Sequence, residues 1–227
     1  MVDETVQIFG GLGFSEEFPA SRAYRDARIS RIYEGTNEIN RLLTVNTLMK
    51  RVMKQEIDFA GPAMKVQKDL MEGVSTPVGE GKYGAERKAI IDFKKAILMV
   101  LGSAVQLQVE GKLNLKEEQE MVMNVSDMIM DSFVAESLLL RVEKLNEMTK
   151  KPHDQEVYDA ILRVYFTDMQ AKIGKDGADA IASFAEGDAA KMLHSGLRKF
   201  MRYTPTNVKK GRRLIAKQLI DANEYCF

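Results

Sequence analysis

The stretch RIYEGTNEINR, residues 31–41, places several side chains that could do chemistry within a few positions. Glu34 lies between an aromatic residue and Gly35, and the hydroxyl of Thr36 and a second carboxylate, Glu38, follow it. A glutamate with an ordinary pKa of about 4.3 is ionised at neutral pH, so it can accept a proton as a general base. A solvated carboxylate beside a helix cap is the simpler explanation of a single glutamate. The residues alone leave both interpretations open.

Two helices and a short loop must position these side chains. The pattern predicts a helix over about 19–28, a loop over 32–36, and a second helix that starts near Asn37 and runs to about 53. Thr36 or Asn37 is expected to cap the start of that second helix. The free N–H groups and partial positive charge at a helix N-terminus suit a phosphate, so a ligand site is a second possible use of this loop.

A glycine-rich block precedes these elements. QIFGGLGF, residues 7–14, has three glycines within four positions, and glycine permits positive φ and a close approach of backbone to ligand. The block does not follow a predicted strand, so the dinucleotide-binding fingerprint does not apply. A tight turn between helices explains the glycines about as well as a ligand loop does.

The remainder of the chain is predicted to be a helical bundle, and the fold class all-α. Apolar residues recur at helical spacing, and no alternating segment is long enough to suggest a sheet. The expected helices cover 86–110, 117–149, 154–173, 178–185, 189–202 and 207–222. Gly174 is expected to end the third of them, and Asp188 and Thr206 or Asn207 to cap later ones. The glycine-rich segment 72–86 is expected to be a linker or an exposed loop.

The apolar stripe of 117–149 is interpreted as bundle core rather than as a partner surface. It consists of Met121, Val125, Met128, Ala135, Leu139 and Val142. A methionine-rich face can also serve as an adaptable contact surface, which is the alternative.

The composition argues against several classes of function. Lys plus Arg and Asp plus Glu number 33 each, so the net charge is zero and no nucleic-acid footprint is present. The short basic patch at 209–213 is interpreted as a solvated helix face, with weak attraction to anionic lipid as the alternative. No apolar run approaches the roughly 18–20 residues of a membrane span, and the acidic N-terminal segment does not resemble an export signal. We therefore expect a protein that is not secreted.

Cysteine and histidine are scarce. The single cysteine, Cys226, excludes an intrachain disulfide and fits a reducing compartment. His153 and His194 are the only histidines, and both are interpreted as surface or structural residues. No metal site is expected.

Several blocks within residues 3–53 occur together in the order and spacing of one known family. The segment QIFGGLGFSEEFPASRAYRDARISRIYEGTNEINR contains a Q-hydrophobic-x-G-G-x-G block, then E-x-P, R-D-A and I-Y-E-G-T. It resembles the C-terminal segment of acyl-CoA dehydrogenases. The later residues resemble, less specifically, the extra helical domain of very-long-chain acyl-CoA dehydrogenases. Two domains are expected from this: the C-terminal part of the catalytic α-domain at 1–53, and an appended helical bundle at 54–227.

The resemblance implies a role for Glu34, which holds the glutamate position of IYEGT. It would be the general base that removes the α-proton of an acyl-CoA thioester while a β-hydride passes to N5 of FAD. The product would be a trans-2-enoyl-CoA, as in fatty acid β-oxidation. The backbone N–H of Glu34 and a flavin hydroxyl would bind the thioester carbonyl, and Gly35 would keep the backbone close to the substrate.

The resemblance also implies cofactor and subunit contacts. Thr36 and Glu38 match positions that contact FAD within the same subunit, although relatives often have glutamine in place of Glu38. Positions that reach the FAD of a neighbouring subunit correspond to Gln7, Gly10 and Gly11, so a homodimer is implied. Arg25 and Asp26 match a family pair that we interpret as a structural ion pair.

Further expectations concern the whole enzyme. Electron-transfer flavoprotein would be the electron acceptor, and the location would be the cytoplasm of a bacterium, or the mitochondrial matrix or inner-membrane face of a eukaryote. Peripheral membrane contact stays an alternative. The chain is expected to be a fragment that by itself neither holds FAD tightly nor turns over substrate. An acyl-CoA oxidase of the same fold and a non-catalytic helical interaction module are the rival interpretations.

Overall fold

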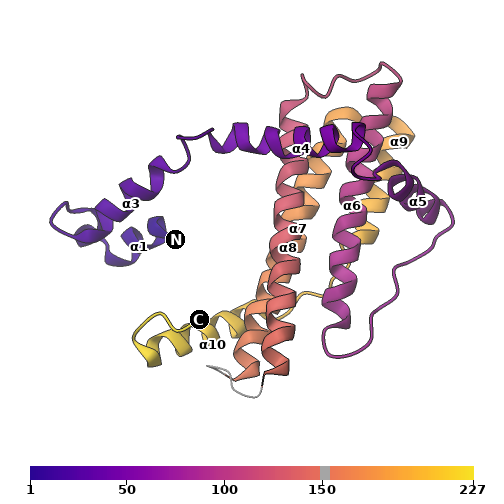
Figure 1. Cartoon of the computed structure of the whole chain (residues 1–227). Coiled ribbons are helices and arrows are strands. Elements are labelled where there is room, and N and C mark those ends of the chain that lie inside the picture. The colour runs from indigo at the N-terminus through magenta and orange to yellow at the C-terminus, as the bar shows by residue number, and fades with distance from the viewer. Residues whose placement is uncertain (149–153) are drawn as a thin grey trace. The chain divides into compact units, whose positions relative to one another are not determined.

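The computed structural model describes residues 1–148 and 154–227, and within these ranges it contains ten helices and no strand (Figure 1). The prediction of an all-α fold is confirmed. The helices are α1 (Val2–Phe9), α2 (Gly11–Phe14), α3 (Pro19–Ile29), α4 (Asn37–Met53), α5 (Ala60–Met71), α6 (Gly84–Val109), α7 (Gln119–Glu147), α8 (Gln155–Phe184), α9 (Gly187–Phe200) and α10 (Val208–Ala222).

The chain divides into two compact units, residues 1–47 and 48–227, so the division falls inside α4. In the first unit α1 packs against α2 and α3, and α2 also packs against α3. Gly13, Ala20 and Val45 are its only buried residues. With so few buried residues, residues 1–47 have little core of their own. Helices in proteins gain most of their stability by packing an apolar face, so this unit has little to stabilise it by itself.

The second unit is built on its three longest helices, α6, α7 and α8, which pack against one another. Figure 1 shows them as long neighbouring columns, with α9 beside them. The predicted stripe on α7 is buried throughout, since Met121, Val125, Met128, Ala135, Leu139 and Val142 are each at most 4% exposed. The interpretation of this stripe as bundle core is confirmed.

The helix predicted to end at Gly174 instead continues to Phe184, and the separate helix expected at 178–185 is its last part. The reason is packing around Gly177. A Cβ on Gly177 would lie 2.9 Å from Cδ1 of Leu197, so the glycine lets α9 approach α8 closely. Ile173 and Ile181 on either side are fully buried, and their burial outweighs the roughly 1 kcal/mol helix penalty of a glycine.

The expectation of an exposed loop holds for residues 72–83, which join α5 to α6 and are mostly exposed, whereas residues 84–86 already belong to α6. Two buried side chains attach this loop to the bundle. Thr76 and Tyr83 are buried. The hydroxyl of Thr76 donates to Oδ1 of Asp92 at 2.5 Å. The hydroxyl of Tyr83 donates to Oδ1 of Asp159 at 2.8 Å, which joins the start of α6 to α8.

Asp159 is the centre of a polar cluster. Its Oδ2 lies 2.7 Å from Nζ of Lys82, and Gln155 donates to its Oδ1 at 3.3 Å. Burial alone would raise the pKa of Asp159. Hydrogen bonds from Lys82, Tyr83 and Gln155, together with the charge of Lys82, lower that pKa below its ordinary value.

This cluster makes the stability of the second unit depend on pH. A carboxyl whose pKa is lower in the folded state stabilises the fold above its unfolded pKa of about 3.9, and this stability is lost as pH falls through the folded pKa. We therefore expect wild type to lose more stability than Asp159→Asn between pH 6 and pH 2, measured by urea unfolding. The control is Asp179→Asn, which removes an exposed partner of Lys175. Equal pH dependence in wild type and Asp159→Asn would contradict the expectation.

The structure bears out one of the two predicted helix caps in the C-terminal part of the chain. Asn207 caps α10, because its side chain accepts from the N–H of Lys210. Asp188 is not a cap, since α9 begins one residue earlier, and the carboxylate of Asp188 instead accepts from Lys191.

His153 lies outside the described residues. No helix in the described ranges is long and apolar enough to cross a membrane.

Candidate active-site loop

The candidate catalytic residues lie on the turn that joins α3 to α4. Backbone hydrogen bonds define this turn: the N–H of Ile32 donates to Ile29, and the N–H of Asn37 donates to the carbonyl of Arg31 at 3.1 Å. Between these bonds, Glu34 and Gly35 have φ of 56° and 88°. Two successive left-handed residues reverse the chain within a few positions.

Glu34 adopts a conformation that costs a non-glycine residue roughly 1–2 kcal/mol. Such strain persists only where the surrounding structure imposes it, and it is concentrated at functional sites. Glu34 is exposed, and its carboxylate forms no hydrogen bond or ion pair with any other residue in the described ranges. The loop thus presents an unpaired carboxylate on a fixed backbone.

Thr36 caps α4, which decides between the two residues expected to do so. The N–H of Ile39 donates to Oγ1 of Thr36 at 3.3 Å, whereas Asn37 is already the first residue of the helix. The N–H of Asn40 donates to the carbonyl of Thr36 at 2.9 Å and continues the first turn. The helix therefore begins at Asn37, three residues after Glu34, as the sequence predicts.

Glu38 lies in the first turn of α4. Hydrogen bonds from its own backbone N–H and from the Thr36 hydroxyl lower the pKa of Glu38. It is thus an ionised acceptor that takes part in the capping of α4. An ionised carboxylate can only accept, so any ligand group that it binds must be a hydroxyl or an N–H donor.

Asn40 holds the loop, a role that the sequence analysis did not assign. Its Nδ2 donates to the carbonyl of Gly35 at 2.9 Å. A Cβ on Gly35 would lie 2.8 Å from Oδ1 of the same asparagine. An asparagine in the first turn of a helix, after a glycine loop, is the signal that could have indicated this contact.

The contact with Asn40 makes Gly35 sensitive to substitution. We expect Gly35→Ala to loosen the start of α4, because alanine is strained at φ of 88° and its Cβ displaces Asn40. Faster amide hydrogen exchange at residues 37 and 40 would report this opening. Gly73→Ala is a matched control, because Gly73 also has positive φ but nothing lies within 4 Å of a Cβ there. Unchanged exchange at both amides would show that Asn40 does not hold the loop.

The glycines of the first block lie in a separate group, at the junction of α1 and α2. Gly10 has φ of 58° and ψ of −135°, a combination that favours glycine. A Cβ on Gly10 or Gly11 would meet no atom within 4 Å, so both glycines face open space. Gln7 is exposed, and its carbonyl accepts from the N–H of Gly10. In the chain, the whole of α3 lies between these three residues and the loop of Glu34.

The expected ion pair between Arg25 and Asp26 is wrong. Arg25 instead pairs with Glu16, nine residues earlier in the chain. Successive residues on a helix point in different directions, so neighbours in the sequence do not face each other.

Exposed apolar side chains surround the loop. Tyr33, Ile39 and Leu43 are each more than half exposed. Exposed apolar side chains beside a candidate base are one sign of a binding site or an interface. No group of three or more metal-ligating side chains occurs in residues 1–148 and 154–227.

Comparisons with known proteins match most of the chain to one family. Two family models, both described as acyl-CoA dehydrogenase, C-terminal domain, match residues 1–49 and 92–199. The "Probable acyl-CoA dehydrogenase" of Bacillus subtilis is 36% identical over 228 residues, which are 99% of this chain and 37% of that protein. The short-chain specific acyl-CoA dehydrogenase of Megasphaera elsdenii is 55% identical over 47 residues, 21% of this chain and 12% of that protein.

A solved structure covers the whole chain. The crystal structure of acyl-CoA dehydrogenase complexed with FAD from Bacillus anthracis matches 100% of this chain and 38% of its own, with a TM-score of 0.91 and 35% identity. The chain thus spans little more than a third of these Bacillus proteins. On these matches, the chain belongs to the acyl-CoA dehydrogenase family and corresponds to its C-terminal part.

Proposed function

We propose that this chain supplies the catalytic base of an FAD-dependent acyl-CoA dehydrogenase, which converts a fatty acyl-CoA to a trans-2-enoyl-CoA. One observation carries the proposal: Glu34, on a strained turn three residues before α4, presents a carboxylate that has no partner among the described residues. Glu34 is exposed, so a substrate can reach its carboxylate. A base needs this combination, because its carboxylate must be free and its position constant.

The chemistry of Glu34 follows from its position on the turn. Its carboxylate would take the α-proton of the thioester, and its backbone N–H would donate to the thioester carbonyl, where negative charge develops. Gly35 carries no side chain and has φ of 88°, and we propose that the substrate approaches the backbone there. FAD, when bound, supplies the acceptor for the hydride that leaves the β-carbon.

The residues proposed for FAD fit such a ligand. Thr36 and Glu38 lie at a helix N-terminus, where they offer a hydroxyl and an acceptor for the hydroxyl or amino groups of the cofactor. Gly10 and Gly11 face open space, so a second subunit's cofactor could approach their backbone. We propose that Gln7, Gly10 and Gly11 reach the FAD of a dimer partner, and that electron-transfer flavoprotein accepts the electrons.

The domain boundary and the state of the isolated chain are part of the proposal. We place the catalytic-domain portion at 1–53 and the appended bundle at 54–227. Because residues 1–47 have little core and the proposed FAD contacts other than Thr36 are exposed, the chain by itself is expected not to retain FAD. Flavin fluorescence during dialysis of the isolated chain with FAD would measure this.

The test of the activity uses an intact enzyme, for example this chain joined to the N-terminal part of the Bacillus anthracis relative. Under anaerobic conditions, a fatty acyl-CoA should bleach the flavin absorbance and yield a trans-2-enoyl-CoA. An enzyme that folds and holds FAD but is not reduced by any acyl-CoA would overturn the proposal. Rapid reoxidation of the reduced enzyme by oxygen alone would instead indicate an acyl-CoA oxidase.

A further inference from the structure

A groove in residues 48–227 lies among α5, α6 and α9. α5 and α9 each pack on α6 and form its two walls, and residues of α6 between Leu98 and Gln106 form its floor. Its volume is about 670 Å³, within the range of about 300–1,000 Å³ that is usual for small-molecule sites.

The lining of the groove is mostly apolar and adaptable. Met99 is buried in the floor, whereas Met64 and Met192 are half-exposed on the two walls. Methionine has several rotatable bonds and a polarisable sulfur, so it adjusts to the shape of its neighbour. Ala63 and Gly102 are small, which lets α5 approach α6 closely, since a Cβ on Gly102 would lie 3.1 Å from that of Ala63. These features suit a flexible aliphatic chain.

Two cations lie toward one end of the groove. α9 runs antiparallel to α6, because Gly196 lies against Met99 while Tyr203, further along, donates to Glu86. Lys199 and Arg202 are therefore nearer to the end marked by Leu98 than to the end marked by Gln106.

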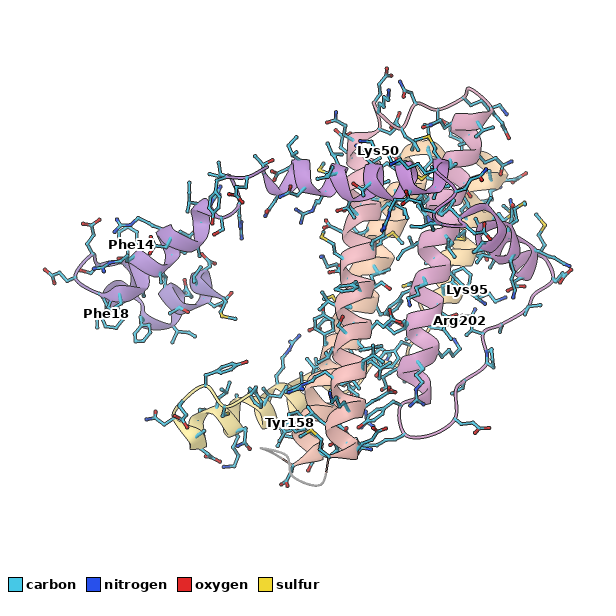
Figure 2. The ribbon with its side chains drawn as sticks, viewed as in Figure 1. Phe14, Phe18, Lys50, Lys95, Tyr158 and Arg202 are labelled. Atoms are coloured by element: carbon cyan, nitrogen blue, oxygen red, sulfur yellow. The ribbon has the colours of Figure 1, made fainter. Side chains whose placement is uncertain are left out.

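The charge at this end is not neutralised. Lys199 donates to the carbonyl of Val74 at 2.6 Å, and Arg202, labelled in Figure 2, is exposed and has no carboxylate partner in the described ranges. Lys95, also labelled there, differs because Oδ2 of Asp69 lies 3.5 Å from its ammonium group. The described lining contains no Asp or Glu. The groove therefore combines an apolar length with an end that complements an anion.

We propose that this groove binds a single-chain anionic amphiphile, a long-chain fatty acid, with its tail along α6 and its carboxylate at Arg202 and Lys199. The site uses none of the residues proposed for the base or for FAD. It can therefore be tested separately from the dehydrogenase reaction.

The size of the groove favours this ligand over an amphipathic helix of a partner protein. A helix about 10 Å across and three turns long would fill roughly 1,200 Å³, nearly twice the groove. The 12 residues of α5 extend over about 18 Å, which gives an extended tail a continuous wall.

Isothermal titration calorimetry of the 227-residue chain with palmitate, below its micelle concentration, tests the site. We expect saturable binding of one palmitate per chain, and octanoate at least about a hundredfold weaker because it buries eight fewer methylenes. Arg202→Gln should weaken palmitate binding roughly tenfold, as for a lost charge-assisted hydrogen bond. Arg198→Gln is the matched control, because Arg198 is exposed on α9 but does not line the groove, and it should bind within about twofold of wild type.

A second pair of variants tests the tail region. Ser103→Phe places a ring in the floor of the groove and should abolish binding, whereas Ser137→Phe adds the same ring to an exposed position of α7 and should not. Far-UV circular dichroism and Tm would verify that each variant folds. The proposal is overturned if palmitate does not bind saturably, if Ser103→Phe binds like Ser137→Phe, or if Arg202→Gln binds like Arg198→Gln. Binding of an acidic helical peptide without binding of palmitate would likewise overturn it.

Discussion

Glu34→Gln should lower kcat of the intact dehydrogenase by roughly 10²–10⁴-fold, the usual contribution of a positioned general base. Glutamine keeps the size and the hydrogen-bonding shape of the side chain but cannot take the α-proton. The backbone at this position should remain left-handed, because the hydrogen bonds of Asn37 and Asn40 that hold the turn are untouched. The oxidised flavin spectrum should therefore be unchanged. Stopped-flow measurement of flavin reduction by an acyl-CoA isolates the affected step.

The controls separate a base from a structural residue. Glu17→Gln changes an exposed carboxylate in the turn before α3 and should leave the rate of flavin reduction unchanged. Glu34→Asp retains a carboxylate, set back by one methylene, and should recover part of the activity that Glu34→Gln loses. A Glu34→Gln enzyme with near wild-type kcat would show that Glu34 is not the base. It would favour the interpretation of these residues as a non-catalytic interaction module.

Phe166→Ala should destabilise the second unit by about 3–5 kcal/mol, a large part of the ~5–15 kcal/mol that holds a typical domain folded. Phe166 is fully buried on α8. Its ring centroid lies 6.3 Å from that of Phe93 on α6 and 5.6 Å from that of Tyr203, which follows α9. Loss of the ring leaves a cavity where three parts of the bundle meet. Urea unfolding followed by far-UV circular dichroism measures the effect.

Phe133 provides the matched control for this substitution. It is also a phenylalanine within a long helix, but its side chain is 69% exposed on α7. Phe133→Ala should therefore change the free energy of unfolding by less than about 0.5 kcal/mol. A Phe166→Ala variant within about 1 kcal/mol of Phe133→Ala would show that the bundle does not depend on this aromatic contact.

The elements that carry a strong periodic signal were predictable from the sequence. The stripe of α7 from Met121 to Val142 repeats over the helix, and each of its members is buried. The start of α4 was predictable for a local reason, because a threonine or asparagine after a glycine is typical of a helix cap. Glu34 and its neighbours could be identified because their order and spacing match one family, a property of sequence alone.

The features that the sequence did not predict share a different cause. Gly174 looks like a helix end, but α8 continues past it, and Leu197 of α9 packs against Gly177 further along. The loop before α6 was predicted, but not that its Thr76 and Tyr83 are hydrogen-bonded to Asp92 and Asp159. In each case the deciding partner is distant in the chain, so no local propensity could reveal it.

The sequence by itself thus determined the helical class, the place of the candidate base and the family, because these depend on local pattern and on the order of motifs. Only the tertiary structure decided that Glu34 has a left-handed backbone and an unpaired carboxylate, and that Asn40 supports the turn. Only the tertiary structure also brings α5, α6 and α9 around a groove with Lys199 and Arg202 toward one end. The physical reason is that backbone strain, pairing of charges and the space between helices arise from packing between distant segments.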